Sequence, residues 1–326
     1  MLKTKKNIFI FFIISIIGLF LPFLLTKYSL HIMNTALIYF MCVLGFEIML
    51  GMGGQISFAQ AGFWGLGAYT TAIATVRLGF HPLIAILISA VFTTVFAVLL
   101  GSVLFRLKGH YFGFATIGVV QILMSIFQNW TPVTGGADGI PNIPNLDIVF
   151  FEFKNSMTYY YVLAIIAVIL ALIVYRMKKT SLGRALEAIR DNEVAAQCMG
   201  VNVFTTKNIA FGISAFFASI AGSLWAFLNG YISATTFSFE QSTIFLIMLM
   251  IGGVTNLAGA FIGAILLTML PELLRFLQEY ILFVYGLGII LTMVFMPQGL
   301  VGGAKTLYAK FIKQRGNSYN ETLNRN

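Results

Sequence analysis

Apolar segments long enough to cross a lipid bilayer recur along almost the whole chain. A helix needs roughly 20 mostly apolar residues to span the hydrocarbon core. Because backbone groups inside lipid must be hydrogen-bonded within the protein, such segments form helices. The ten candidate spans are Ile8–Leu25, Ile32–Met52, Phe58–Val76, Leu83–Phe105, Tyr111–Asn129, Thr158–Tyr175, Ile209–Gly230, Ser242–Val254, Leu257–Leu274 and Tyr280–Met296. The second, third, eighth and ninth of these fit the pattern of a full span least well. The sequence predicts an all-α, polytopic helical membrane protein, a single domain over residues 1–326 with about ten transmembrane or half-membrane helices.

The composition supports a membrane protein and excludes an ordinary soluble domain. The chain is 59% hydrophobic and 10% charged, with a mean hydropathy of +0.91, which is far from the average of soluble proteins. Its opening M-L-K-T-K-K and apolar run imitate a signal peptide, but no small-residue cleavage site follows, so we expect a retained first span. Cys42 falls in a predicted span and Cys198 in a polar segment, so no disulfide is expected.

The positive charges predict the orientation of the chain. When the ten spans alternate from a cytoplasmic N-terminus, all of the 20 lysines and arginines fall inside except Lys27, Arg77, Lys154 and Arg275. This is the asymmetry of the positive-inside rule. The net charge of +9 therefore needs no nucleic acid to explain it. Both termini, the segment 176–207 and the tail 299–326 are expected to be cytoplasmic, and the loop 130–157 to lie outside.

One long polar segment, Ser181–Val201, interrupts the apolar chain. It reads as two short helices, with Ser181 and Asn192 as N-caps and Gly200 ending the second helix. Leu182, Leu186 and Ile189 recur at helical spacing. The segment is either an ordinary solvated connection or an element that a cytoplasmic partner grips.

Two glycine-rich junctions without charge, Gly51–Gly62 and Gly252–Gly263, are predicted on the inner side. Interrupted helices in the two halves of a transporter commonly mark the substrate site. Glycines at such spacing also serve close helix packing, which is the simpler role for Gly259 and Gly263. Gln55, Ser57 and Asn256 within the two junctions need polar partners at depth.

Glu47 is an acidic residue well inside a predicted span. A carboxylate there is a functional hypothesis, because its charged form is costly in lipid. Glu47 could be a proton site or a pathway contact. It could also be a neutral, hydrogen-bonded group at a helix interface, since no basic residue is predicted at the same depth.

No motif for catalysis, a cofactor or a metal is recognisable. His31, His81 and His110 are scattered near span boundaries, unlike a metal cluster. The chain contains no G-x-x-x-x-G-K-[ST] loop, so any ATP that drives it must bind another subunit. An intramembrane enzyme is not supported either, because no pair of spans offers a nucleophile with a base.

With these segments in view, the chain resembles the permease subunits of branched-chain amino-acid ABC importers, specifically the longer of the two usual permeases. The likeness covers nearly the whole length. Its carriers are L-G-F-E-I-M-L-G-M-G-G-Q-I-S-F-A-Q-A-G-F-W-G-L-G-A-Y from Leu44, T-G-G-A-D-G-I from Thr134, S-L-G-R-A-L-E-A-I-R-D-N-E-V-A-A-Q-C-M-G-V from Ser181, G-G-V-T-N-L-A-G-A-F-I-G-A from Gly252 and the terminal Y-G-L-G-I-I-L-T-M-V-F-M-P-Q-G-L.

The resemblance implies a permease in a bacterial plasma (inner) membrane. Its partners would be a second permease subunit, two cytoplasmic ABC ATPase subunits and an extracytoplasmic substrate-binding protein. Substrate-pathway residues would be Glu47, Gly53, Gly54, Gln55, Ser57, Gln60 and Asn256. The outer-loop motif would be Thr134, Gly135, Gly136, Asp138 and Gly139. ATPase coupling would involve Ser181, Gly183, Arg184, Glu187, Arg190, Asp191, Glu193, Ala195, Ala196 and Gly200.

Four positions depart from the family pattern. Gln60 stands where histidine is common, Glu47 where a neutral residue is usual, and Thr255 and Ala260 where glycine and proline are frequent. These changes bear on the substrate more than on the fold. The alternatives are therefore a permease for urea, an amide or a sugar, or a secondary transporter that uses Glu47.

Overall fold

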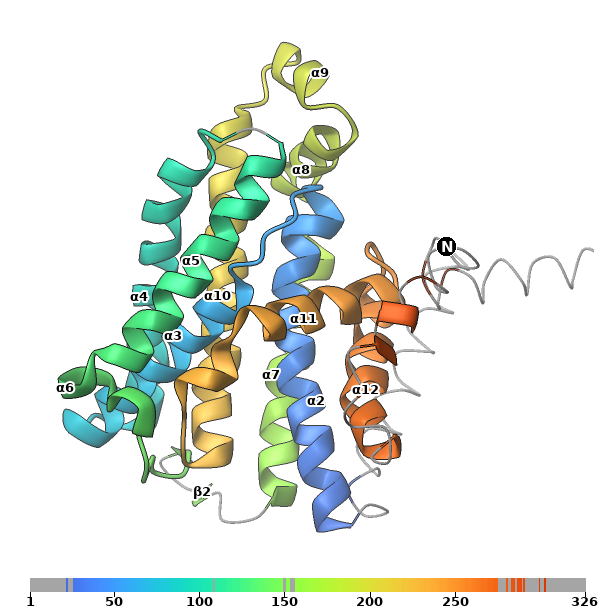
Figure 1. Cartoon of the computed structure of the whole chain (residues 1–326). Helices are drawn as coiled ribbons and strands as arrows, with labels where there is room; N and C mark the ends of the chain where they lie inside the picture. Colours follow the sequence, from blue (N-terminus) through green and yellow to red (C-terminus); the bar gives the residue numbers. More distant parts are fainter. Residues whose placement is uncertain are drawn as a thin grey trace, which may run out of the picture.

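Long helices running side by side form the body of the protein (Figure 1). The computed structural model describes residues 26–107, 109–148, 151–152 and 156–274, with residue 22 and short stretches between 280 and 302. Five helical stretches of the described chain are long and apolar enough to cross a membrane: Lys27–Met52, in which α2 (Lys27–Phe46) continues as the π-helix η1 (Glu47–Met52), α4 (Pro82–Leu104), α5 (His110–Asn129), α7 (Ser156–Met177) and α10 (Val203–Asn229).

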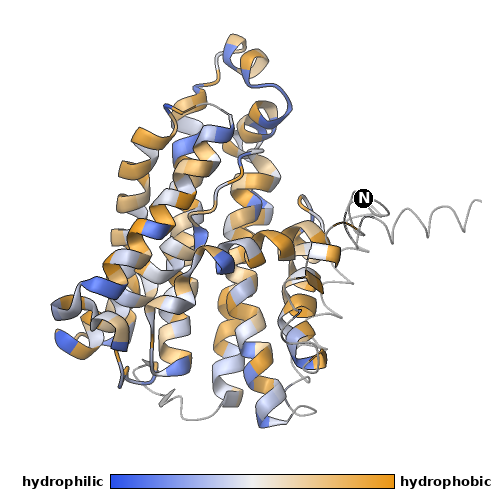
Figure 2. Cartoon of the chain, in the orientation of Figure 1, coloured by the Kyte–Doolittle hydropathy of each residue, from blue (hydrophilic) through white to orange (hydrophobic). Residues whose placement is uncertain are grey.

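Shorter elements complete the described chain. They are α3 (Gln60–Ala72) with the π-helix η2 (Ile73–Arg77), α6 (Thr131–Thr134), η3 (Gly136–Asp138), β1 (Asp147–Ile148), β2 (Phe151–Glu152), α8 (Ser181–Asp191), α9 (Glu193–Cys198), η4 (Ala234–Phe237), α11 (Phe239–Gly252) and α12 (Leu257–Leu273). The predicted all-α membrane fold is confirmed, with one antiparallel pair of two-residue strands added. Apolar residues dominate the long helices, whereas polar residues gather at the α8–α9 end, at the top of Figure 2.

Most predicted spans agree with helices to within a few residues. The second begins earlier than predicted, at Lys27 rather than Ile32, because Thr26 caps it: the Thr26 side chain accepts a hydrogen bond from the Ser29 N–H. The first predicted span, most of the tenth and most of the tail 299–326 lie outside the described residues.

Helix α3 begins halfway through the bundle rather than at its end. After η1 the chain turns at Gly54, whose φ is +65°, and continues without helix to α3. A Cβ added to Gly62 would lie 2.9 Å from the Leu123 side chain and 3.5 Å from Val120. Both residues are just past the midpoint of the 20-residue α5. The third predicted span, Phe58–Val76, is therefore the helix formed by α3 and η2, which begins at mid-depth after an extended segment.

Helix α11 begins at the same depth as α3. The Ser242 hydroxyl in its first turn accepts a hydrogen bond from the Ala61 N–H (2.9 Å) and donates one to the Phe58 carbonyl (2.6 Å). The far end of α11 reaches the α8–α9 end of the bundle, where a Cβ on Gly51 would lie 2.3 Å from the Val254 carbonyl oxygen. Figure 1 shows α11 crossing the middle of the bundle obliquely.

The eighth predicted span thus crosses only part of the bundle. Helix α11 has 14 residues, or about 21 Å at 1.5 Å per residue. The Gly51–Gly62 segment therefore meets the non-helical segment before α11 at mid-depth. Gly252–Gly263 instead forms the turn after α11 and the start of α12. Helix α12, which has 17 residues, runs from the turn after α11 towards the opposite end, where Glu272 accepts a hydrogen bond from Tyr28 at the start of α2.

Close packing of α3 on α10 holds the centre of the molecule together. A Cβ on Gly222 would lie 2.0 Å from the Trp64 carbonyl, and one on Gly67 would lie 2.5 Å from the Ser219 Cα. Only glycine allows this approach of two helix backbones. Trp64 itself packs edge-on against Trp225 and Phe245.

We expect Ser242→Ala to destabilise the protein by about 1–3 kcal/mol, because it leaves the buried Ala61 N–H and the partly buried Phe58 carbonyl without their partner. Ser219→Ala is the matched control. Ser219 is equally buried, but its side-chain partner Ser89 keeps a second hydrogen bond, to Ser223. Thermal unfolding of the detergent-purified variants measures the difference. Equal thermal unfolding midpoints for the two variants would show that the hydrogen bonds of Ser242 do not stabilise the contact between α11 and the start of α3.

Candidate functional site

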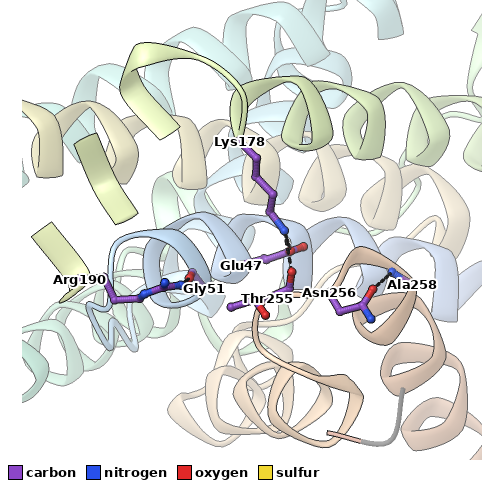
Figure 3. A network of polar contacts seen from close by, with 7 residues as sticks. All are labelled: Glu47, Gly51, Lys178, Arg190, Thr255, Asn256 and Ala258. Atoms are coloured by element: carbon purple, nitrogen blue, oxygen red, sulfur yellow. Dashed lines mark hydrogen bonds and ion pairs between the residues drawn. The ribbon is translucent and has the colours of Figure 1, made fainter. Parts of the chain in front are cut away.

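A buried ion pair lies near the α8–α9 end of the bundle (Figure 3). Lys178, the first residue after α7, places its Nζ 2.5 Å from Glu47 Oε1 and 2.9 Å from the Thr255 carbonyl oxygen. Glu47 is fully buried, and the Lys178 side chain is 21% exposed. The expectation that no basic residue reaches the depth of Glu47 is wrong, because the four-carbon lysine stem extends from the helix end back into the bundle.

This ion pair joins three parts of the chain. Glu47 opens the π-helix η1, Lys178 lies between α7 and α8, and Thr255 is in the turn from α11 to α12. The other carboxylate oxygen of Glu47, Oε2, is buried without a hydrogen-bond partner among the described residues. A carboxylate paired in this way has its charge compensated within the protein, an arrangement that differs from the neutral, hydrogen-bonded group considered for Glu47.

The polar segment forms two helices, as predicted, and they project from the end of the bundle (Figure 1). Asn192 caps α9 as predicted, with its side chain accepting from the Ala195 N–H at 3.0 Å. Gly200 has a φ of +84° just after α9. The cap of α8 is Thr180 rather than Ser181, since the Thr180 backbone is extended and its hydroxyl accepts from the Gly183 N–H at 3.3 Å.

Helix α8 lays one side on the bundle and leaves the other in solvent. Gly183, Leu186 and Ile189 are buried, whereas Ser181, Arg184 and Asp191 are exposed and Glu187 is partly exposed. In α9, Glu193 and Ala195 are exposed and Ala196 is buried. The helical spacing of the apolar residues therefore predicted the contact face correctly.

Two side chains tie the α8–α9 hairpin to the bundle. Arg190 donates from Nη1 to the Gly51 carbonyl at 2.7 Å (Figure 3), and its stem packs so closely on Gly54 that a Cβ there would lie 2.6 Å from Arg190 Cγ. Lys207 of α10 lies 2.6 Å from the Glu193 carboxylate. Movement of the hairpin is thus linked to η1 and to α10.

The residues predicted for a pathway lie in two separate environments. Gln60 is buried between α2 and α10, donating to the Cys42 carbonyl at 2.9 Å and accepting from the Ser214 hydroxyl at 2.9 Å. Ser57 accepts from the Ala59 N–H, Gly53 is buried, and Gly54 and Gln55 are exposed or partly exposed. Asn256, by contrast, caps α12 close to the Glu47 ion pair (Figure 3).

The outer-loop motif forms tight turns at the end of the bundle opposite α8–α9. Gly135, Gly136 and Gly139 all have φ between +64° and +78°, a conformation that favours glycine. Thr134 donates to the Phe127 carbonyl at 2.8 Å, and Asp138 is exposed, with its carbonyl accepting from Tyr231. The loop then pairs with the chain before α11, through reciprocal hydrogen bonds between Ile140 and Ile232.

Sequence reasoning missed Lys178, Lys207 and Ser242 as parts of this framework. Lys178 and Lys207 were counted only as inside charges, because a charge count does not show where a long side chain turns. The signal for Ser242 was the shortness of its apolar run, which leaves too few residues for a full crossing.

Comparison with known proteins identifies relatives over nearly the whole chain. A family model described as "Branched-chain amino acid transport system / permease component" matches residues 28–293. The high-affinity branched-chain amino acid transport system permease protein LivM of Escherichia coli (strain K12) is 30% identical over 86% of this chain and 71% of its own. LivM of Salmonella typhimurium is 29% identical over 91% and 75%. A probable LivM of Methanocaldococcus jannaschii is 21% identical over 77% and 81%. No solved structure matches the chain.

We expect Lys178→Met to destabilise the protein more than Glu47→Gln, because the methionine leaves a fully buried carboxylate unpaired whereas the glutamine leaves an ammonium that reaches water. Removing one member of a buried pair costs on the order of 3–5 kcal/mol, and replacing both members is much cheaper. The double variant Glu47→Gln/Lys178→Met should therefore recover most of the lost thermal stability. Additive losses in the double variant would show that the two groups are not energetically coupled.

Proposed function

Because the chain belongs to the family of branched-chain amino acid transport permease components, we propose that it is the permease subunit of an ATP-driven importer for branched-chain amino acids. It is a multi-pass membrane protein, with five helical stretches long enough to span a bilayer in the described chain. In the proposal it forms the pathway together with a second permease. Two ATPase subunits act on one side, and a substrate-binding protein delivers cargo on the other.

The α8–α9 hairpin is the observation that carries this proposal. Its outer surface exposes two large apolar side chains, Val194 (71%) and Met199 (85%), beside the exposed charges of Arg184 and Asp191. Exposed apolar groups rimmed by polar ones are typical of protein interaction sites. In the proposal an ATPase subunit grips this surface, which places the hairpin and both chain termini in the cytoplasm of a bacterial cell, at the inner membrane.

The hairpin is also linked mechanically to the bundle. Glu193–Lys207 connects α9 with α10, and Arg190 connects α8 with the carbonyl of Gly51 in η1. A rigid-body displacement by an ATPase would therefore reach two of the central helices. Coupling of this kind needs discrete alternative arrangements of packed elements, and the interrupted helices α3 and α11 provide joints where those arrangements can differ.

The alternatives for function are not favoured. A secondary transporter that uses Glu47 as its ion-coupling group would need a carboxylate able to exchange its ion, whereas Glu47 is held by Lys178. Permeases for urea, amides or sugars share the architecture that the resemblance implies, but LivM relatives match over most of the chain. The opposite end of the bundle, with its turns at Thr134–Gly139, is the proposed docking side for the binding protein.

Purification from the native membrane in mild detergent tests the proposed assembly. Mass spectrometry of the eluate should recover P-loop ATPases and a second, similar permease, and the reconstituted complex should import leucine when ATP and the binding protein are supplied. Recovery of the chain alone, under conditions in which other membrane complexes survive, would contradict the proposal.

We expect Met199→Glu to lower co-purification of the ATPases by at least about tenfold, because a buried charge in an apolar contact costs more than 1.4 kcal/mol. The thermal stability of the permease itself should not change, since Met199 contacts solvent. Leu78→Glu is the matched control, an exposed leucine (63%) at the opposite end of the bundle. Unchanged ATPase recovery with Met199→Glu would remove α9 from the docking surface.

A further inference from the structure

We propose that Glu240, in the first turn of α11, lies on the water-accessible pathway and binds the ammonium group of the transported amino acid. This inference rests on the proposed import of amino acids, and it names a residue of this chain that contacts the transported amino acid. Glu240 lies between the seventh and eighth predicted spans, Ile209–Gly230 and Ser242–Val254.

The depth of Glu240 follows from its neighbours. Ser242, two residues further along, is hydrogen-bonded to Ala61 and Phe58. Phe239 packs on Phe58, with ring centroids 5.3 Å apart. The start of α3 meets α5 just past the α5 midpoint, as described above. Glu240 therefore lies near the middle of the helical bundle, far from both ends.

Glu240 is exposed at this depth, unlike Glu47. An exposed carboxylate at the middle of a bilayer cannot face lipid without a large cost, and charged groups there face water-filled cavities or protein. The first turn of a helix favours a negative charge, which helps to explain a glutamate at this position. The helix dipole alone does not compensate the lost hydration of a carboxylate, so the face of α11 that carries Glu240 must border water or a polar partner.

Helix α5, which lies beside the start of α11 (Figure 1), exposes polar as well as apolar side chains. Gln121, just past its midpoint, and Ser125, one turn further, are exposed, along with the apolar Phe114 (70%) and Ile122 (62%). The outward residues of α4 differ, because Leu87, Val91, Val95 and Leu99 are all apolar and more than half exposed, as expected for a lipid-facing helix. Figure 2 shows the polar start of α11 in the middle of the bundle, on the same side as α5.

A second observation is an unsatisfied polar group on the residue that follows Glu240. The side-chain nitrogen of Gln241 is buried and has no hydrogen-bond partner among the described residues. An unpaired buried donor is costly, and it is the kind of group that completes its hydrogen bonding when a polar ligand arrives. An amino acid is a suitable ligand for such a site, because its ammonium group forms a charge-assisted hydrogen bond with a carboxylate such as that of Glu240.

Thiol labelling in the assembled importer tests the aqueous face. Glu240→Cys, Gln121→Cys and the control Val95→Cys are made with Cys198→Ser, which removes the exposed native thiol. A charged, membrane-impermeant thiol reagent should modify Glu240→Cys and Gln121→Cys at least about tenfold faster than Val95→Cys, because the reactive thiolate forms only in water. Equal, slow modification at all three positions would overturn the proposal.

Leucine uptake by proteoliposomes tests the ammonium contact. Glu240→Gln should lower uptake by roughly 10- to 100-fold, the value of a charge-assisted hydrogen bond, and Glu240→Asp should restore part of it. ATPase stimulation by the loaded binding protein should survive in both variants, because Glu240 is remote from α8–α9. Uptake by Glu240→Gln within twofold of wild type would refute the contact. A wild-type complex that imports no leucine would instead refute the proposed function, while the labelling rates still report on the aqueous face.

Discussion

Two hydrogen bonds of Ser242 satisfy backbone groups at mid-depth, where helices α3 and α11 both begin. The hydroxyl accepts from Ala61 at the start of α3 and donates to the carbonyl of Phe58 before it. The neighbouring Phe58 N–H is taken by the Thr116 hydroxyl of α5. Backbone groups at membrane depth have no water to replace such partners. The hydroxyl groups of Ser242 and Thr116 supply these partners, so the backbone before α3 can leave the helical conformation at mid-depth. This is the place where α3, α5 and α11 meet.

The two ends of the bundle depend on this crossing point in different ways. At the α8–α9 end, Gly51 accepts from Arg190 and lies against Val254 in the turn after α11, so the hairpin is linked to η1 directly and to the end of α11 through η1. At the opposite end, the pairing of Ile140 with Ile232 anchors the chain that leads into α11. A displacement at either end thus acts on elements that converge on Ser242.

Apolar patterning predicted which segments are helical but not how deep each begins. The helix pair from residue 181 and its Asn192 cap were predictable because cap chemistry and periodicity are local. The pairing of Glu47 with Lys178 was not, since it joins positions 131 residues apart through a flexible side chain. The mid-depth start of α11 was missed for a similar reason: its partner, Ala61, lies in another part of the chain, and the polar run before it resembles an ordinary loop.

Glu47 and Glu240 illustrate opposite ways of placing a carboxylate in a membrane protein. Glu47 is enclosed, and a lysine that reaches in from the helix end compensates its charge. Glu240 is left exposed, so the surroundings of the helix must hydrate it. A compensated charge fixes helices relative to one another, whereas a hydrated one requires that water reach the middle of the bundle. The exposed residues of α4 are apolar, whereas the exposed Glu240 and Gln121 lie on α11 and α5. In the proposed importer, the side of α5 and α11 is therefore the one on which a second permease would close a pathway.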